Sequence, residues 1–395
     1  MFFKNIFLFL FLLSTNTINA QGNNLPTKLL LIPSVSGLHI AVNRYSTALS
    51  FGAVGDGVTD DTYALIRAFS SGQNLDLEGR KYLIDVSKPG LILGLKPSNN
   101  TIIEGNGAEI ILKPNKLMAY GMITLENRKN VRIYNLKLTG DVKNHYGSEG
   151  EWGMGFWMQG SKNCELHHVE ANEMWGDGFY VGNYAKETSE GGGIFNSSAR
   201  ANRRDGLTVT SCKNFTVKNS NFTETGIIKS IYPRFGVCIE PEPHSYSTID
   251  NLKLINIRTE HNFGGGMRVM SPYLGSSTHS NAKCHIYIEK FVSKHDGNKK
   301  IWGGTGLRLA DYFYENTYDG LIIIKEFNVI DLIGEVPYRW VINSKSIISI
   351  YATDLRVDGV PGYAYIPDIP ASSAACAIAS SPNNNNLLIT LYFIK

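Results

Sequence analysis

The chain has 395 residues, and its 38 lysines and arginines nearly balance its 35 aspartates and glutamates, giving a formal net charge of +3. This weak charge, without a basic cluster among aromatic residues, argues against a nucleic-acid partner. The five cysteines are scattered without metal-ligand spacing. We therefore expect buried free thiols, with a stacked disulfide as the alternative, no metal site and no dedicated cofactor.

The first 20 residues have the features of a signal peptide. Lys4 precedes an apolar run over residues 6–13, and Ala20 offers a small residue for cleavage. The run is too short to span a bilayer. We therefore predict that residues 1–20 are removed and that the protein is secreted, extracellular or periplasmic, without a membrane partner.

A glycine-rich segment and an amphipathic helix are predicted next. Residues 51–62 read Phe-Gly-Ala-Val-Gly-Asp-Gly-Val-Thr-Asp-Asp-Thr, and Leu65, Ile66 and Phe69 follow at helical spacing. Thr59 or Asp60 can N-cap this helix. We expect residues 44–84 to form an N-terminal cap and the first coil of the repeat described next. An uncovered end would expose core and unpaired strand edges.

A glycine-led apolar phrase then recurs along the chain. Its seven copies begin at Gly121, Gly155, Gly178, Gly206, Gly236, Gly266 and Gly306. A unit that returns every 20–50 residues or so is typical of a solenoid. We expect the first and third residues after each glycine to point inward, and the second and fourth to point outward.

A second phrase follows several copies of the first. It occupies residues 131–138, 215–222, 252–259 and 322–329, with apolar residues at its first, third, sixth and eighth positions except for Ser220 and Thr259. Because strand alternation has a period of two, the doubled gap predicts two short strands joined by a one-residue bend. Asn135, Asn219 and Asn256 lie at this bend, where asparagine tolerates the left-handed conformation.

Three short strands per coil predict an all-β fold, a single right-handed parallel β-helix. We expect one domain over residues 21–395, with coils at 85–360 and a C-terminal cap at 361–395. A leucine-rich repeat fits poorly, because its leucine pattern and its helices are missing.

The segment at residues 51–69 resembles the entry motif of the pectin lyase-like β-helix superfamily, in its rhamnogalacturonase/epimerase-like branch. Relatives in that superfamily include polygalacturonases, mannuronan C5-epimerases and phage tailspike depolymerases. The resemblance implies a right-handed parallel β-helix that acts on a polysaccharide. A monomer is the default expectation, and a tailspike-like homotrimer stays open.

The outward positions of the glycine phrases supply the candidate site. The second position holds Ile123, Trp157, Tyr180, Thr208, Cys238, Arg268 and Arg308. Neighbouring coils lie about 4.8 Å apart, so Trp157 and Tyr180 should lie side by side as stacking platforms for sugar rings. A second interpretation is that they are ordinary surface aromatics.

Two aspartates precede the glycine in adjacent copies. Asp177 and Asp205 should therefore lie one coil apart, each raising the pKa of the other. Paired carboxylates can protonate a glycosidic oxygen and activate water, so we predict hydrolysis by this pair with Glu240 as a third carboxylate. The alternative is that Asp-Gly is ordinary turn chemistry before a strand.

A second candidate set lies further along the same face. Glu242-Pro-His244 resembles the Asp-Pro-His signature of mannuronan C5-epimerases, with Glu in place of Asp. The resemblance implies proton abstraction next to a uronate carboxylate, with His244 or Tyr246 moving protons and Arg268 neutralising the carboxylate. A lyase of this kind could use calcium. The alternative is a plain surface salt bridge between Glu240 and Arg268.

The sequence therefore predicts a secreted, carbohydrate-active β-helix enzyme. The first hypothesis is hydrolysis of an extracellular polysaccharide that contains uronic acids. The second is a polysaccharide lyase or uronan C5-epimerase, and the third is a non-catalytic carbohydrate-binding protein.

Overall fold

The computed structural model describes residues 27–34, 37–89, 93–230, 232, 234–241, 247–270, 282–298, 304–311, 319–334, 336–342, 347–361, 375–380 and 387–392. The chain divides into two compact units, Met1–Arg44 and Tyr45–Lys395. The first contains an antiparallel pairing of β1 (Thr27–Ser34) with β2 (Gly37–Thr47). The second contains the repeat.

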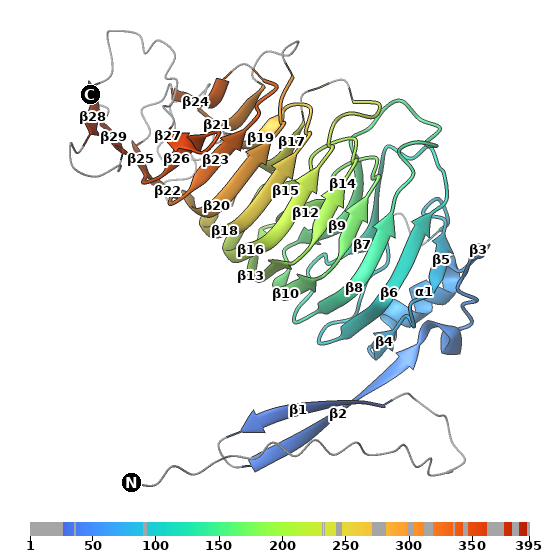
Figure 1. The fold of residues 1–395 in the computed structure, drawn as a ribbon. Coiled ribbons are helices and arrows are strands. Elements are labelled where there is room, and N and C mark those ends of the chain that lie inside the picture. The colour runs from blue at the N-terminus through green and yellow to red at the C-terminus, as the bar shows by residue number, and fades with distance from the viewer. Residues whose placement is uncertain are drawn as a thin grey trace, which may run out of the picture. The chain divides into compact units, whose positions relative to one another are not determined.

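The glycine phrases form one parallel sheet, called here the glycine sheet (Figure 1). Its strands, in stacking order, are β7 (Ala119–Thr124), β9 (Trp152–Gln159), β12 (Phe179–Tyr184), β15 (Leu207–Val209), β17 (Phe235–Ile239), β19 (Gly265–Met270), β21 (Thr305–Asp311) and β24 (Val336–Ile342). Each strand pairs in parallel with the strand one coil away, as a parallel β-helix requires, and the end of β12 also pairs antiparallel with β13, its neighbour in sequence.

The second phrases form a bent sheet with two arms. Strands running through both arms are β6 (Ile102–Leu112), β8 (Arg132–Thr139), β16 (Cys212–Thr223), β18 (Ile249–Glu260) and β20 (Lys283–Lys294). The first arm adds β4 (Asn74–Asp76), β10 (Lys162–His167), β13 (Glu187–Phe195), β22 (Asp319–Ile324) and β25 (Ile347–Ala352). The second arm adds β3 (Asp56–Asp60), β5 (Lys81–Ile84), β11 (Glu170–Asn172), β14 (Ser198–Arg200), β23 (Phe327–Ile330) and β26 (Leu355–Val357).

The predicted bend between the arms is confirmed. Asn135, Asn219 and Asn256 have φ angles of 52°, 54° and 54°, in the left-handed region that asparagine tolerates. Asn256 Nδ2 also donates to Asn219 Oδ1 at 2.9 Å, and Asn219 Nδ2 donates to Asn196 Oδ1 at 3.0 Å. The repeated asparagines therefore set the corner and bond one coil to the next.

Close approach between coils explains the repeated glycine. A Cβ atom at Gly155 would lie 2.6 Å from the Gly178 carbonyl oxygen, and one at Gly206 would lie 2.7 Å from that of Gly236. These are backbone atoms that have little freedom to move. A larger residue would therefore push adjacent coils apart.

The core fills the space between the sheets. From the Gly155 copy to the Gly306 copy, the first and third residues after each glycine are buried as predicted, and Phe156 stacks on Phe179 with ring centroids 5.5 Å apart. Four of the cysteines are buried free thiols, also as predicted: Cys164, Cys212, Cys238 and Cys284.

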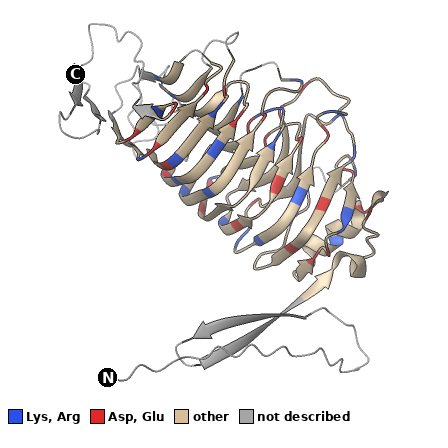
Figure 2. Ribbon diagram, in the orientation of Figure 1, with Lys and Arg blue, Asp and Glu red and all other residues tan. Residues whose placement is uncertain are grey.

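The outer faces carry both signs of charge, as Figure 2 shows along the stacked strands. Several pairs join adjacent coils, including Arg132 Nε with Glu165 Oε2 at 3.2 Å and Lys283 Nζ with Asp250 Oδ2 at 3.1 Å. Exposed pairs of this kind add little stability, about 0–1 kcal/mol each. They fit the near-zero net charge.

The predicted helix is present as α1 (Thr62–Ser70), with η1 (Ala48–Phe51) before it. Its N-cap residue is Asp61, and not Thr59 or Asp60 as predicted. The Asp61 carboxylate accepts instead from the backbone N–H groups of Val54 and Gly55 at 2.7 and 3.0 Å, because the preceding glycine turn brings them close. The closure of the coil end by α1 stays a prediction.

Antiparallel strands follow the last coil. β26 pairs with β27 (Val360–Pro361), while β28 (Ala375–Ser380) pairs with β29 (Leu387–Tyr392), which also pairs with β25. Strands β27, β28 and β29 lie within or next to the predicted C-terminal cap at 361–395, and the capping role stays a prediction. No helix in the described part of the chain is long and apolar enough to cross a membrane.

Candidate functional site

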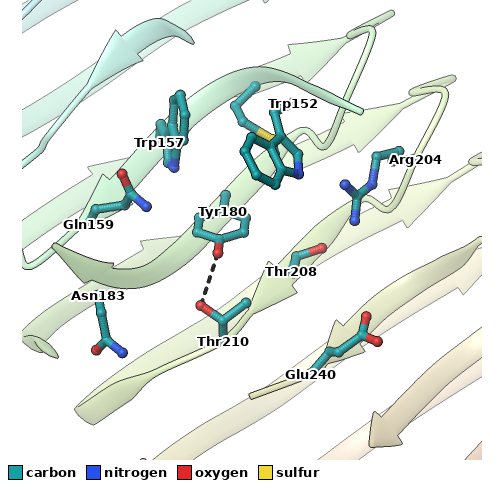
Figure 3. Close-up of a pocket in the computed structure, with 10 residues that line it drawn as sticks. Trp152, Trp157, Gln159, Tyr180, Asn183, Arg204, Thr208, Thr210 and Glu240 are labelled. Carbon is teal, nitrogen blue, oxygen red and sulfur yellow. Dashed lines mark hydrogen bonds between the residues drawn. The ribbon is translucent and has the colours of Figure 1, made fainter. Parts of the chain in front are cut away.

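A pocket of about 240 Å³ opens on the outer face of the glycine sheet. Its lining comes from strands β9, β12 and β15, from the segments that flank β15, and from the residue that follows β17 (Figure 3). The lining residues are Trp152, Met154, Trp157, Gln159, Tyr180, Asn183, Arg204, Thr208, Thr210 and Glu240. Aromatic, amide, hydroxyl and charged groups thus meet in one concave site.

Strand register brings the two predicted aromatic platforms together. Trp157 of β9 pairs with Tyr180 of β12, which pairs with Thr208 of β15. The Trp157 and Tyr180 rings meet edge to face, with centroids 6.2 Å apart and planes at 81°. Both side chains line the pocket, so their predicted placement is confirmed, and two walls of the pocket are aromatic.

The first copy of the glycine phrase does not follow the predicted alignment. Gly121 pairs with Met154 and not with Gly155, so the register is shifted by one residue. Thr124 therefore takes the place beside Trp157 that was predicted for Ile123. Ile123 is consequently buried in the core. A one-residue shift exchanges the inner and outer faces of a strand.

Several polar atoms of the lining lack partners within the protein. Thr210 Oγ1 donates to the Tyr180 hydroxyl at 3.1 Å. By contrast Trp157 Nε1, Asn183 Oδ1 and Thr208 Oγ1 are buried without a hydrogen bond. A buried polar group costs free energy unless it is paired. A ligand or water in the pocket would supply partners after small side-chain movements.

The rim of the pocket is formed by Trp152, which the sequence analysis missed. Its side chain is 56% exposed. The segment before it is fixed by two contacts, Trp175 Nε1 to the Glu149 carbonyl at 3.2 Å and Arg203 Nη1 to the Gly150 carbonyl at 2.5 Å. No repeat marks this residue, because it lies in an insertion ahead of the glycine phrase.

Arg204 is the cation of the pocket and was also missed. Its Nη1 lies 3.0 Å from Glu151 Oε2, and its Nε lies 3.4 Å from Asp177 Oδ1. Glu151 in turn contacts Arg234 Nη2 at 3.3 Å. Arg204 therefore joins the pocket to a network of charges behind it.

The expected outward position of Asp177 and Asp205 is wrong, because both are fully buried and neither lines the pocket. They lie in the turns before β12 and β15, where strand alternation does not apply. Asp177 Oδ1 accepts from the Asp205 N–H at 3.0 Å, and Asp205 Oδ1 accepts from the Phe235 N–H at 2.6 Å. Each carboxylate thus binds the backbone of the next coil.

Burial raises the pKa of Asp177 to about 6, while the Arg204 guanidinium lowers it and the Asp205 carboxylate adds to the rise. The predicted effect of one aspartate on the other is therefore present for Asp177. A raised pKa is found both in catalytic carboxyls and in structural ones, so it does not assign a role.

Glu240 and Arg268 form the salt bridge that the sequence analysis gave as an alternative. Arg268 Nη2 lies 2.8 Å from Glu240 Oε2 and 3.2 Å from Cys238 Sγ. The guanidinium also lies over the Phe235 ring, 5.1 Å from its centroid. Glu240 lines the pocket, whereas Arg268 is not among the lining residues.

The remaining predicted residues are Glu242, His244 and Tyr246. They lie outside the described residues. The described chain reaches Pro241, directly after the pocket residue Glu240, and resumes at Ser247.

No protein-family profile matches the chain. A curated relative, the uncharacterized protein YclG of Bacillus subtilis (strain 168), is 28% identical over 239 residues, which are 54% of this chain and 41% of that protein. Gene product 12 of bacteriophage phi29 in its pre-mature form has a TM-score of 0.52 at 15% identity, over 79% of this chain and 45% of that chain. The ORF18 protein of Geobacillus virus E2 has a TM-score of 0.50 at 11% identity, over 91% and 81%.

These likenesses concern the fold. The fold is a parallel β-helix. The chain spans less than half the length of the Bacillus relative and of the phi29 protein. The resemblance seen in residues 51–69 is thus confirmed at the level of fold, and activity has to be argued from the site.

Proposed function

We propose that this protein binds an extracellular polysaccharide, with one sugar ring held in the pocket against the side chains of Trp157 and Tyr180. The observation that carries this proposal is the edge-to-face aromatic pair, 6.2 Å between centroids, within a concave site lined by amides and hydroxyls. A ligand site of this kind combines apolar walls with a few polar groups that fix orientation.

The chemistry of a sugar ring matches both parts of the lining. Its C–H faces can pack on the Trp157 ring, and exposed Trp152 extends the aromatic surface at the rim. Its hydroxyls can pair with Gln159, Asn183 and Thr208. A polymer could continue along the glycine sheet, because its strands stack one coil upon the next.

The sequence favoured a polysaccharide that contains uronic acids, so the ring in the pocket would carry a carboxylate. Arg204 is the pocket cation that would face its carboxylate, in place of Arg268, which is paired with Glu240. Arg204 already contacts Glu151, so we expect acidic and neutral polymers to differ modestly in affinity.

Affinity electrophoresis through gels that contain uronate-bearing or neutral polysaccharides tests the binding proposal. We expect retardation in at least one polymer, and Trp157→Ala should weaken it by about 10- to 100-fold, the value of one buried aromatic ring. Tyr134→Ala is the matched control, because Tyr134 stacks on His167 on the bent sheet at 4.8 Å and not in the pocket. Equal losses in both variants would show that the pocket is not the binding site.

Cleavage or epimerisation of the bound polymer is the second candidate function, favoured by Glu240. It is the one carboxylate among the ten lining residues, and the segment with Glu242, His244 and Tyr246 follows it at once. A lyase or C5-epimerase would use that segment. Hydrolysis needs a second carboxylate, and Asp177 or Asp205 could serve only if binding opened the turns that bury them.

Mass spectrometry of products formed in heavy-oxygen water separates these reactions. Shortened chains that carry the label would indicate hydrolysis, and Asp205→Asn should then abolish it. Unlabelled fragments lighter by one water would indicate a lyase, and His244→Ala should then abolish it. Retarded polymers of unchanged length and unchanged uronate composition would leave binding as the function.

A further inference from the structure

Three potential metal ligands converge at a corner of the coils, where the second arm of the bent sheet ends. Glu260 is the last residue of β18, His261 follows it, and His295 follows β20. Because Glu260 pairs with Lys294 in the parallel register, His261 and His295 occupy equivalent places on adjacent coils. Their φ angles are 57° and 51°, and their ring centroids lie 5.0 Å apart.

The donor atoms of these residues lie within reach of one ion. One atom from each of Glu260, His261 and His295 lies within 4.8 Å of the other two, and Glu260 Oε1 lies 3.8 Å from His295 Nδ1. Zinc bonds to imidazole nitrogen and carboxylate oxygen are about 2.0–2.2 Å long, so tetrahedral ligand atoms lie about 3.4 Å apart. Side-chain movements of about 1 Å would close the set.

His295 is already oriented as a metal ligand. Its Nε2 lies 3.1 Å from Asp331 Oδ2, while its Nδ1 is buried without a hydrogen bond. Donation from Nε2–H to Asp331 leaves the lone pair on Nδ1, which faces Glu260. A carboxylate behind a ligating histidine is the usual second layer of a metal site, fixing the tautomer and the ring orientation.

Two cations border the same carboxylate. Arg258 Nη2 binds Glu260 Oε2 at 2.8 Å, which leaves Oε1 facing His295. Lys294 Nζ lies 3.6 Å from Oε1. Arg258 therefore orients the carboxylate, whereas Lys294 would compete with a bound cation.

We propose that Glu260, His261 and His295 bind a divalent transition-metal ion, with Asp331 as a positioning residue. Two imidazoles and one carboxylate suit Zn²⁺ and its borderline-soft neighbours better than Ca²⁺ or Mg²⁺. The three protein ligands leave a fourth position for water. Since the ligands come from two coils and Asp331 from a third, the ion fastens successive coils together.

His285 also lies near two carboxylates, but its surroundings differ from those of the proposed site. His285 Nδ1 lies 3.5 Å from Asp250, and its Nε2 lies 2.9 Å from Asp319. These carboxylates approach different nitrogens of one ring, so they do not converge on a single ion. His285 is therefore a matched control.

The experiment is titration of the metal-stripped full chain with zinc chloride by calorimetry, together with the absorption spectrum of the Co²⁺ form. We expect one equivalent of Zn²⁺, a tetrahedral Co²⁺ spectrum and an unfolding temperature that rises with added metal. His261→Gln and His295→Gln should abolish binding, while Asp331→Asn should weaken it by about 10- to 100-fold. Lys294→Gln should strengthen it, and His285→Gln should match the unaltered protein.

Several results would overturn the site. One is no Zn²⁺ binding by the unaltered chain below millimolar concentration. Another is unchanged affinity in His261→Gln, an exposed position where folding should be unaffected. The unfolding temperature in chelator, compared among variants, separates a lost ligand from a lost fold. A loss of affinity in His285→Gln equal to that in His295→Gln would also reject the assignment.

Discussion

The bend of the bent sheet and the outer column of the glycine sheet are built by the same stacking of coils, yet they differ in composition. At the bend asparagine recurs on adjacent coils, and Asn219 bonds to both Asn196 and Asn256 at 2.9–3.0 Å, while His168 and Lys290 take the same place on other coils. In the outer column every coil from β9 to β19 presents a different side chain.

This difference assigns the asparagine bend to the scaffold of the coils and the outer column of the glycine sheet to the binding site. The side-chain amide of each stacked asparagine hydrogen-bonds to the asparagine on a neighbouring coil and needs no ligand. Repetition at the bend therefore favours stability. The column of Trp157, Tyr180 and Thr208 leaves an open pocket with unpaired polar atoms, and variation there creates a surface specific for one ligand. Four experiments test this division, in order of decreasing expected effect.

Replacing Asn256 by valine should damage the scaffold most. A β-branched residue at φ 54° is strained by about 1–2 kcal/mol, and the lost bond to Asn219 adds about 1 kcal/mol. We expect a decrease of about 3 kcal/mol in the free energy of unfolding, measured by chemical denaturation. Asn256→Gly is the control, because it keeps the bend and loses only the bond. Equal stability of the valine variant would show that the bend does not depend on this conformation.

The pH dependence of stability tests the raised pKa of Asp177. Folding raises its pKa from 3.8 to about 6, so the folded protein keeps a proton that the unfolded chain releases. This contribution is complete below about pH 3.8 and is lost as the pH rises through about 6, an effect below about 3 kcal/mol. Thermal unfolding at successive pH values measures it.

Asp177→Asn should flatten this part of the profile, because it retains an oxygen for the Asp205 N–H and does not titrate. Burial also raises the pKa of Asp296 to about 6, with the same sign, so a residual slope is expected. An unchanged slope in Asp177→Asn would contradict the raised pKa.

Substitutions of Asp205 test whether its hydrogen bond to the next coil makes it part of the scaffold. Asp205→Ala removes the acceptor of the buried Phe235 N–H, and we expect a loss of about 1–3 kcal/mol of unfolding free energy. Asp205→Asn keeps an acceptor and should stay close to the unaltered protein. If Asp205→Asn kept this stability but abolished polymer cleavage, Asp205 would belong to the site.

The smallest effect is expected at the hydroxyl of Tyr180. Tyr180→Phe keeps the aromatic wall and removes the group that accepts from Thr210. We expect polysaccharide affinity to fall about threefold, within the range of one hydrogen bond, by calorimetric titration. A loss above about 30-fold would mean that the hydroxyl, and not the ring, dominates recognition.

Much of the coil could be predicted because its causes are local or periodic. The doubled gap and asparagine in the second phrase located the bend, since both depend on one residue's backbone preference. The glycine phrase located the inward positions and placed Trp157 beside Tyr180, because parallel register carries one copy onto the next. The alignment was wrong at Ile123, where the register is shifted by one residue.

The site itself depended on contacts between coils. Asp177 and Asp205 lie in turns, where the inward and outward alternation of a strand does not apply. Only the folded chain therefore shows that both carboxylates are buried against the backbone of the next coil. Trp152 and Arg204 reach the pocket from outside the repeat, and His261 meets His295 across 34 residues of sequence. The sequence by itself determined a parallel β-helix with an aromatic outer column, through strand periodicity and backbone preference. The tertiary structure decided which carboxylates and histidines meet, because insertions and turns place side chains by packing that no repeat encodes.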